Sequence, residues 1–137
     1  MNAVAVDTSV LLAMLKGEEQ GERWLKSLQR TAETASLLAS SVVVAEVRSF
    51  FASDEACRSA LQLLDVRFSA LTEDSAQLAG KIYRDYRRLG GPRKTILPDF
   101  LVAAHASLQA DALATEDRGY RRSYFPSIRL LSALSAD

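Results

Sequence analysis

The chain has little of several features that define large classes of proteins. It holds a single cysteine, Cys57, among 137 residues, so no intramolecular disulfide can form, which fits a reducing compartment. Its longest stretch without a charged side chain is Thr34–Ala45, twelve residues, which is too short to cross a bilayer. The N-terminus lacks a basic leader, and Asp7 interrupts its apolar stretch, so we expect no signal peptide. These absences predict a soluble, cytoplasmic protein with no membrane partner.

Glycine and histidine are equally informative by their scarcity. The six glycines never form GxGxxG, which excludes the dinucleotide-binding fingerprint. The one histidine, His105, has no His or Cys partner for a zinc site. It follows Asp99 by six residues, about 240° around a helix, so we expect it to pack or lie on the surface, facing away from that acid.

The net charge is zero, but its distribution is uneven. Residues 1–79 hold seven Lys/Arg and eleven Asp/Glu, a net of −4, whereas residues 80–137 hold ten and six, a net of +4. The overall charge therefore favours no partner, while the C-terminal part can carry a local surface for an anionic ligand.

Short apolar runs alternate with helical periodicity along the whole chain. The length suits one domain, residues 1–137, with a loose tail from about 132 to 137. Strands separated by helices predict an α/β domain with a mainly parallel sheet. We expect Thr8 or Ser9 to cap the first helix, Ser40 or Ser41 to cap the helix at 41–52, and the capping signature Thr72–Ser75 to begin the helix at 72–89. The expected strands are 3–7, 36–40, 66–71, 112–115 and 128–131, and the expected helices are 10–15, 18–30, 41–52, 54–65, 72–89 and 98–109, followed by a turn or short helix at 118–123.

Four acidic residues lie at similar junctions between apolar runs and their neighbours: Asp7, Glu46, Asp99 and Asp117. An ionised carboxylate beside apolar neighbours is costly unless its charge is compensated. Four such groups would repel one another, and hard divalent cations relieve that repulsion best. Sites in open α/β sheets form beyond the carboxyl ends of the strands, where Asp7 and Asp117 lie. The pattern therefore favours an acidic metal pocket.

Each acid also has a simpler interpretation. Asp7 can end a strand and cap a helix, although Thr8 and Ser9 could do that instead. Glu46 shares a largely apolar helix face and could pair with Arg48. Asp99 could be a helix-start residue favoured by the helix dipole, and Asp117 an ordinary turn residue. Order and spacing favour the joint interpretation only together with the family resemblance that the same residues carry, described below.

Basic residues flank two of these acids. Such runs usually form a solvated helix face, and the alternative is a surface beside the pocket that binds the phosphates of a nucleic acid. Tyr83, Tyr86 and Tyr120 could stack on unpaired bases or pack in the core. The two basic clusters are Lys81, Arg84, Arg87, Arg88, Arg93 and Lys94, then Arg118, Arg121 and Arg122.

Four motifs in order resemble those of a known family. They are Val6–Leu12, Val43–Val47, Leu97–Ala106 and Leu113–Tyr120. Together they resemble a PIN domain, and more closely the VapC-like ribonuclease toxins of prokaryotic toxin–antitoxin pairs, over essentially the whole chain. The resemblance implies a three-layer α/β/α sandwich that binds Mg²⁺ or Mn²⁺ and cuts RNA. It also implies a cognate antitoxin that lays a helix into a hydrophobic groove, and a homodimer.

The resemblance carries over residue by residue. Asp7, Glu46, Asp99 and Asp117 match the acidic positions of the family, and Thr115 matches its hydroxyl before the last acid. Glu116 is a departure, and we expect it either to add an outer carboxylate or to point to solvent. Supporting hydrogen bonds are expected from Thr8, Ser9 and Thr115, and RNA contacts from Arg87, Arg88, Arg93, Lys94, Arg118 and Arg121.

Two other functions fit part of the pattern. A non-catalytic PIN-like module could keep the acids and only hold RNA or protein, which metal-dependent turnover would separate from a nuclease. A phosphatase-type α/β enzyme also begins with a strand followed by Asp, but it needs a second Asp two residues later, where this chain has Ser9.

Overall fold

The chain forms a parallel sheet covered by helices, in a computed structural model that describes residues 1–91, 96–117 and 124–133. The strand order is β3-β2-β1-β4-β5, and every pairing is parallel. The strands are β1 (Ala3–Val6), β2 (Ser36–Ser40), β3 (Val66–Ser69), β4 (Ala112–Ala114) and β5 (Leu130–Leu131). The helices of the described part are α1 (Thr8–Leu15), α2 (Glu19–Thr31), α3 (Ser41–Arg48), α4 (Asp54–Leu63), α5 (Glu73–Arg88) and α6 (Ile96–Gln109).

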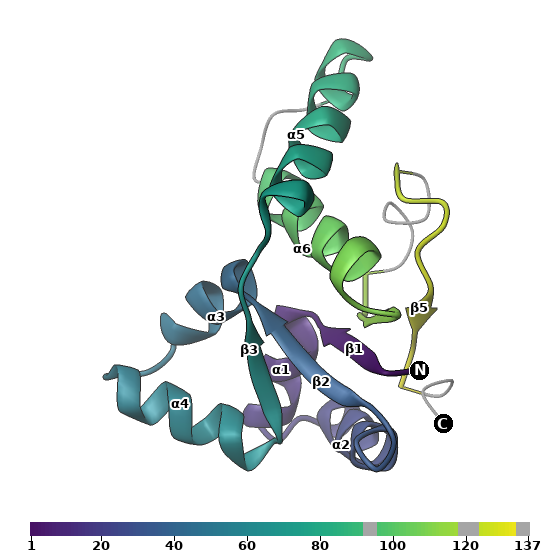
Figure 1. Cartoon of the computed structure of the whole chain (residues 1–137). Helices are drawn as coiled ribbons and strands as arrows, with labels where there is room; N and C mark the ends of the chain where they lie inside the picture. Colours follow the sequence, from purple (N-terminus) through teal and green to yellow (C-terminus); the bar gives the residue numbers. More distant parts are fainter. Residues whose placement is uncertain (92–95, 118–123, 134–137) are drawn as a thin grey trace.

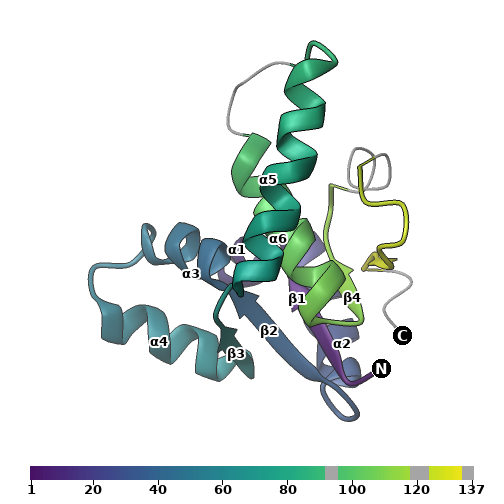
Figure 2. The ribbon, with the colours of Figure 1, turned by 45° about the horizontal axis from the view of Figure 1, so that its top comes forward.

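Helices cover both faces of the sheet. Figures 1 and 2 show α1 and α2 on one side of the strands, and α6 with α5 against it on the other. Both views place α3 and α4 beside β2 and β3, away from β5. The predicted three-layer α/β/α architecture with a parallel sheet is therefore confirmed. The prediction of a single domain over 1–137 stays a prediction.

The central pairing of β1 with β4 determines which residues meet at the carboxyl edge of the sheet. Val6 is in register with Ala114. The next amide, that of Asp7, donates to the carbonyl of Ala114 at 3.0 Å. The residues that follow the two strands, Asp7 and Thr115, are consequently brought side by side although 108 positions separate them.

Most helices begin at a residue whose side-chain oxygen accepts a backbone N–H, as expected of N-caps. Ser40 caps α3 through the amide of Val43, and Thr72 caps α5 through the amide of Ser75, as the sequence predicts. The first helix differs, because its N-cap is Asp7 and not Thr8 or Ser9. A carboxylate suits this place because it also meets the positive end of the helix dipole.

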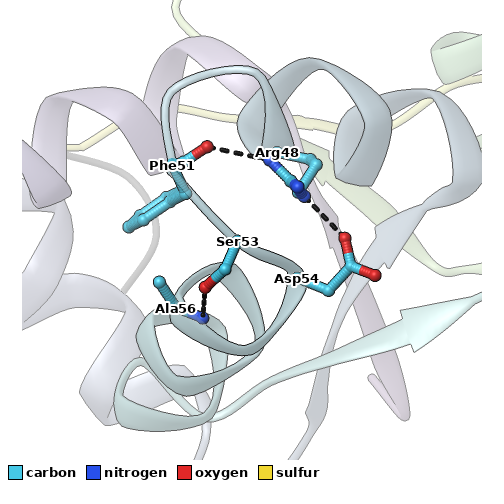
Figure 3. Close-up of polar contacts among 5 residues, drawn as sticks. All are labelled: Arg48, Phe51, Ser53, Asp54 and Ala56. Carbon is cyan, nitrogen blue, oxygen red and sulfur yellow. Dashed lines mark hydrogen bonds and ion pairs between the residues drawn. The ribbon is translucent and has the colours of Figure 1, made fainter.

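Helix α3 ends at Arg48 and not near residue 52 as predicted, because Arg48 stabilises a turn there. Its Nη1 donates to the carbonyl of Phe51 at 2.8 Å, and its Nε donates to the Asp54 carboxylate at 2.7 Å (Figure 3). Ser53 then caps α4 by accepting from the amide of Ala56 (Figure 3). A side chain satisfying the carbonyl of the turn replaces the helical hydrogen bonds that would continue α3.

The end of β3 and the start of α6 also differ from the predicted boundaries. Strand β3 ends at Ser69, and the segment predicted to extend it to Leu71 is bound by Gln109, whose Nε2 donates to the carbonyl of Ala70 at 2.8 Å. Helix α6 begins at Ile96, before Pro98, because proline is tolerated in the first turn of a helix. The turn predicted at 118–123 lies outside the described residues.

Two clusters of buried side chains form the core. The larger lies between the sheet and its flanking helices and contains the fully buried Trp24, Leu11 and Leu113. The smaller joins α5 and α6 around Phe100. Tyr83 and Tyr86 pack edge-on against the Phe100 ring, with centroids 6.2 and 5.5 Å away, so the core interpretation applies to both.

The C-terminal segment is held further along than expected. Ala133 is buried, and its carbonyl accepts the Ser27 hydroxyl at 2.6 Å, so the loose tail predicted from residue 132 does not include Ala133. Residues 134–137 lie outside the described part. Within the described ranges, no helix combines the length and the apolar character needed to cross a membrane.

Two glycines offer a matched test of helix packing. A Cβ at Gly21 in α2 would lie 2.1 Å from the Ala13 carbonyl oxygen, whereas one at Gly80 in α5 would meet nothing within 4 Å. We expect Gly21→Ala to lower the free energy of unfolding by about 1–3 kcal/mol, because the backbones of α1 and α2 must separate. We expect Gly80→Ala to raise it by about 0.5–1 kcal/mol, as alanine favours a helix interior. Urea unfolding of both variants measures this, and equal effects would contradict the close packing of α1 and α2.

Candidate functional site

All four predicted acids line one cavity. Its volume is about 340 Å³, and Thr8, Ser9 and Leu12 complete its lining. Asp7 follows β1, Glu46 lies in the last turn of α3, Asp99 in the first turn of α6 and Asp117 shortly after β4. The fold thus brings acids from four separate parts of the sequence to the carboxyl edge of the sheet.

Asp7 is the most buried of the four, with 7% of its surface exposed. Its Oδ1 accepts the backbone N–H of Thr8 at 2.8 Å, and its Oδ2 accepts the hydroxyl of Thr115 at 2.7 Å. The capping interpretation of Asp7 is therefore correct, and it does not compete with a place in the cavity. One carboxylate oxygen caps the first turn of α1, and the other accepts the Thr115 hydroxyl just after β4.

Glu46 is exposed, so the prediction that it lies on a buried apolar face is wrong. The buried stripe of the short helix α3 consists of Val43 and Val47, and Glu46 lies beside it. Its Oε1 accepts the Thr8 hydroxyl at 2.7 Å. The alternative ion pair with Arg48 is also wrong, because Arg48 binds Asp54.

Asp99 and Asp117 line the cavity from two different elements, the start of α6 and the segment after β4. Asp99 is half-buried and lies in the first turn of α6, where the helix dipole favours a negative charge. Asp117 is exposed, and its backbone N–H donates to the Thr115 Oγ1 at 3.1 Å. Thr115 therefore contacts two of the acidic residues through one buried hydroxyl.

The donor chemistry of this cavity fits a hard divalent cation. Carboxylate and hydroxyl oxygens are the ligands that Mg²⁺ and Mn²⁺ prefer, and none of the described residues that line the space offers a softer donor. However, among residues 1–91, 96–117 and 124–133, no group of three or more His, Cys, Asp or Glu side chains is placed to hold a metal ion. The acids share a cavity, and a shared metal ion remains a prediction.

Glu116 contacts α2, and it is not among the residues that line the cavity. Its carboxylate accepts the indole N–H of Trp24, which is fully buried in α2. From the sequence, Trp24 is expected on the apolar face of its helix, either packed in the core or lining a hydrophobic groove for a partner. A buried indole N–H needs an acceptor, which is a signal readable from sequence, but no local pattern points to an acceptor 92 positions away.

The basic residues of α5 are exposed along a helix that extends beyond the sheet (Figure 1). The guanidinium of Arg87 lies 5.5 Å from the centre of the Tyr83 ring. Lys81 and Arg84 line a separate groove on the same helix, while Arg88 lies at its last position. The other members of the two basic clusters lie outside the described residues, namely the predicted RNA contacts Arg93, Lys94, Arg118 and Arg121, together with Arg122.

His105 is fully buried in α6, so the prediction that it packs away from Asp99 is confirmed. Its Nε2 is hydrogen-bonded to the Ser69 Oγ at 2.9 Å, and its Nδ1 has no partner among the described residues. It does not line the acidic cavity. Burial lowers the pKa of the imidazole below its ordinary value, because the charged form loses hydration.

This lowered pKa predicts how stability depends on pH. Below about pH 6.5, His105 binds a proton in the unfolded chain but stays neutral in the folded chain. Lowering the pH therefore lowers the free energy of unfolding, until the pH drops below the pKa of His105 in the folded protein. We expect the free energy of unfolding of the native protein, minus that of His105→Gln, to decrease from pH 7.5 to 5.5. The slope is at most about 1.4 kcal/mol per pH unit. A difference that does not change across this range, measured by urea unfolding, would contradict a neutral buried histidine.

Comparison with known proteins places this geometry in context. A model of the PIN domain family matches residues 4–126. A comparison with curated proteins finds no match. Among solved structures, a chain of VapBC2 from Rickettsia felis bound to a DNA fragment from their promoter superposes with a TM-score of 0.70 at 18% identity, covering 95% of this chain and 98% of that one.

Two further structures are similar over the same extent. One is VapBC-1 from nontypeable Haemophilus influenzae, with a TM-score of 0.70 at 20% identity, covering 96% of this chain and 98% of that chain. The other is FitAcB from Neisseria gonorrhoeae, with a TM-score of 0.62 at 19% identity and the same coverage. At such low identity, these similarities establish a shared fold.

Proposed function

Because the chain belongs to the PIN domain family, we propose that it is a metal-dependent endoribonuclease and the toxin of a toxin–antitoxin pair. The observation that carries this proposal is the cavity where Asp7, Glu46, Asp99 and Asp117 meet. Four carboxylates at one surface have little purpose in packing, and their mutual repulsion favours a cation between them.

In this proposal, Asp7 is the central ligand of Mg²⁺ or Mn²⁺, and Asp99, Asp117 and Glu46 complete the inner and outer coordination. The bound cation supplies Lewis-acid stabilisation of the negative charge that develops on a phosphodiester during hydrolysis. The side chains of the chain itself provide the cage and the orientation of each carboxylate.

Hydrogen bonds to the carboxylates support this role. Both oxygens of Asp7 accept a bond, one from the Thr8 amide and one from the Thr115 hydroxyl, so its orientation is fixed before any ion arrives. The Thr8 hydroxyl similarly directs Glu46. Such outer contacts tune metal affinity in known metal sites. Ser9, which lines the cavity, is the third supporting hydroxyl of the proposal.

The proposed substrate is RNA, held through its phosphates. Arg87 and Arg88 are exposed on α5, the helix that packs along α6 and so beside the element that carries Asp99. The proposed surface also includes Arg93, Lys94, Arg118 and Arg121. Contacts to phosphates would give affinity without sequence preference.

The proposed protein partner is a cognate antitoxin, and the proposed assembly is a homodimer. The similar structures include VapBC assemblies, and one is described as a toxin–antitoxin complex from Klebsiella pneumoniae. An antitoxin would keep the nuclease inactive by lying in a hydrophobic groove, which is a recognised mode of helix binding.

One observation favours a second function, a PIN-like module that holds RNA or protein without cutting. In the described part of the chain, the acids do not form a group of three placed for a metal ion. Turnover separates the two functions. Cleavage of RNA that requires Mg²⁺ or Mn²⁺ and stops with a chelator supports the nuclease, whereas RNA binding with no cleavage in either metal supports the module.

The role of Asp7 is tested by Asp7→Asn, which removes the charge but keeps an oxygen for the Thr8 amide. We expect the rate of RNA cleavage in Mn²⁺ to fall by about 100-fold or more, because the central ligand loses its charge. Asp65→Asn is the matched control, since Asp65 is exposed and its φ of 58° also suits asparagine. Cleavage by Asp7→Asn at the rate of the control would refute the assignment.

The RNA surface is tested by reversing two charges, in the variant Arg87→Glu/Arg88→Glu. We expect weaker RNA binding and a salt dependence whose log–log slope falls by roughly one per lost phosphate contact. The control Lys26→Glu/Arg58→Glu changes the net charge equally at exposed positions on α2 and α4. Fluorescence anisotropy from 50 to 300 mM salt measures both. Identical slopes for the two variants would reject this surface.

A further inference from the structure

Helix α2 contributes the largest fully buried side chain of the described residues, Trp24, and its indole N–H is directed at Glu116. Trp24 is the only tryptophan of the chain. Its acceptor is the residue immediately before Asp117, one of the acids that line the cavity. The buried side of α2 is therefore attached to the segment that delivers an acid to the proposed site.

Helix α2 is itself firmly held. Gly21 lets its backbone approach the Ala13 carbonyl so closely that a Cβ would be 2.1 Å away, which fixes α2 against α1. The Ser27 hydroxyl binds the carbonyl of Ala133 beyond β5 at 2.6 Å. Because α1 begins at Asp7, the position of Trp24 is tied to the residue at the centre of the cavity.

The segment 115–117 is anchored at each of its three residues by a different contact. The Thr115 amide donates to the Leu131 carbonyl at 3.3 Å, and its hydroxyl donates to Asp7. The Glu116 carboxylate is held by Trp24. The Asp117 amide donates back to the Thr115 hydroxyl. The contacts close a ring that runs from Asp7 through α1 and α2 to Glu116 and returns through Thr115.

We infer that Trp24 is a positioning residue of the proposed site: it holds Glu116 outside the cavity and thereby directs Asp117 into it. This inference rests on the proposed function, because it concerns the acids of that same cavity. Two neighbouring carboxylates are given different tasks, one as an anchor and one as a ligand. Glu116 contributes no direct metal contact.

Two variants separate anchoring from ligation. Trp24→Phe keeps an aromatic ring in the core and removes the N–H donor, while Glu116→Gln removes the charge and keeps an oxygen that can accept from Trp24. If Trp24 anchors Glu116, we expect Trp24→Phe to weaken Mn²⁺ binding about tenfold, which is the low end of the effect of such outer contacts. Glu116→Gln should then weaken it less than about threefold. If Glu116 is instead a metal ligand, Glu116→Gln should have the larger effect of the two.

Ser27→Ala is the matched control for general loosening. It breaks another polar contact between α2 and the C-terminal part of the chain, but at Ala133, which is not among the residues that line the cavity. We expect Ser27→Ala to lower the unfolding midpoint while leaving the Kd of Mn²⁺, measured by calorimetry without RNA, within twofold of the native value. If Trp24→Phe and Ser27→Ala both weaken Mn²⁺ binding in proportion to the decrease in their unfolding midpoints, the inference is overturned.

Amide hydrogen exchange tests the same inference without metal. We expect the Asp117 amide to exchange roughly tenfold faster in Trp24→Phe than in the native protein or in Ser27→Ala, because the segment is freed locally. Should Trp24→Phe not fold, Glu116→Ala removes the contact from its exposed side and carries the same expectation. Unchanged protection of Asp117 overturns the inference. Failure of the native protein to bind Mn²⁺ while this exchange difference holds instead refutes the proposed function.

Discussion

The hydrogen bond from the Thr115 hydroxyl to the Asp7 carboxylate is the interaction on which the candidate site depends. It forms because β1 and β4 pair in parallel with Val6 opposite Ala114, so the residues that follow both strands leave the sheet together. Buried hydroxyl–carboxylate bonds are strong, and each partner leaves the other unsatisfied if removed. A shift of the register by one residue would turn Thr115 to the other face of the sheet and separate it from Asp7.

Around this bond, the same groups perform structural and chemical tasks at once. The Asp7 carboxylate begins α1 with one oxygen and meets Thr115 with the other. Thr8 donates its amide to Asp7 and its hydroxyl to Glu46. Because each side chain serves two neighbours, the orientation of the carboxylates comes from the same contacts that hold the helix starts. In the proposed site, the orientation of Asp7 and Glu46 would therefore be set before a cation binds.

Local patterns in the sequence predict the elements well, because apolar runs, capping residues and glycines act over a few positions. The α/β architecture, the parallel sheet and the caps at Ser40 and Thr72 all follow from such patterns. The errors arise where a side chain outside an element determines where that element ends. Arg48 ends α3 by binding beyond it, and Gln109 holds the segment after β3 from 39 positions away. The meeting of the four acids at one cavity was predictable from strand ends, whereas the exposure of Glu46 was not, because it depends on how α3 lies against α1.

Electrostatic repulsion explains why the acids share a cavity without three of the described ones being placed to hold one ion. Carboxylates that share a cavity lower their mutual repulsion by standing apart, so a cavity lined by Asp7, Glu46, Asp99 and Asp117 need not contain three acids already within reach of one ion. Asp7 is buried and held by two hydrogen bonds, whereas Glu46 and Asp117 are exposed. In the proposed site, the affinity for a cation would therefore depend on how closely the backbone carries the exposed acids to Asp7. For Asp117, the backbone is held by the hydrogen bond from its amide to the Thr115 hydroxyl.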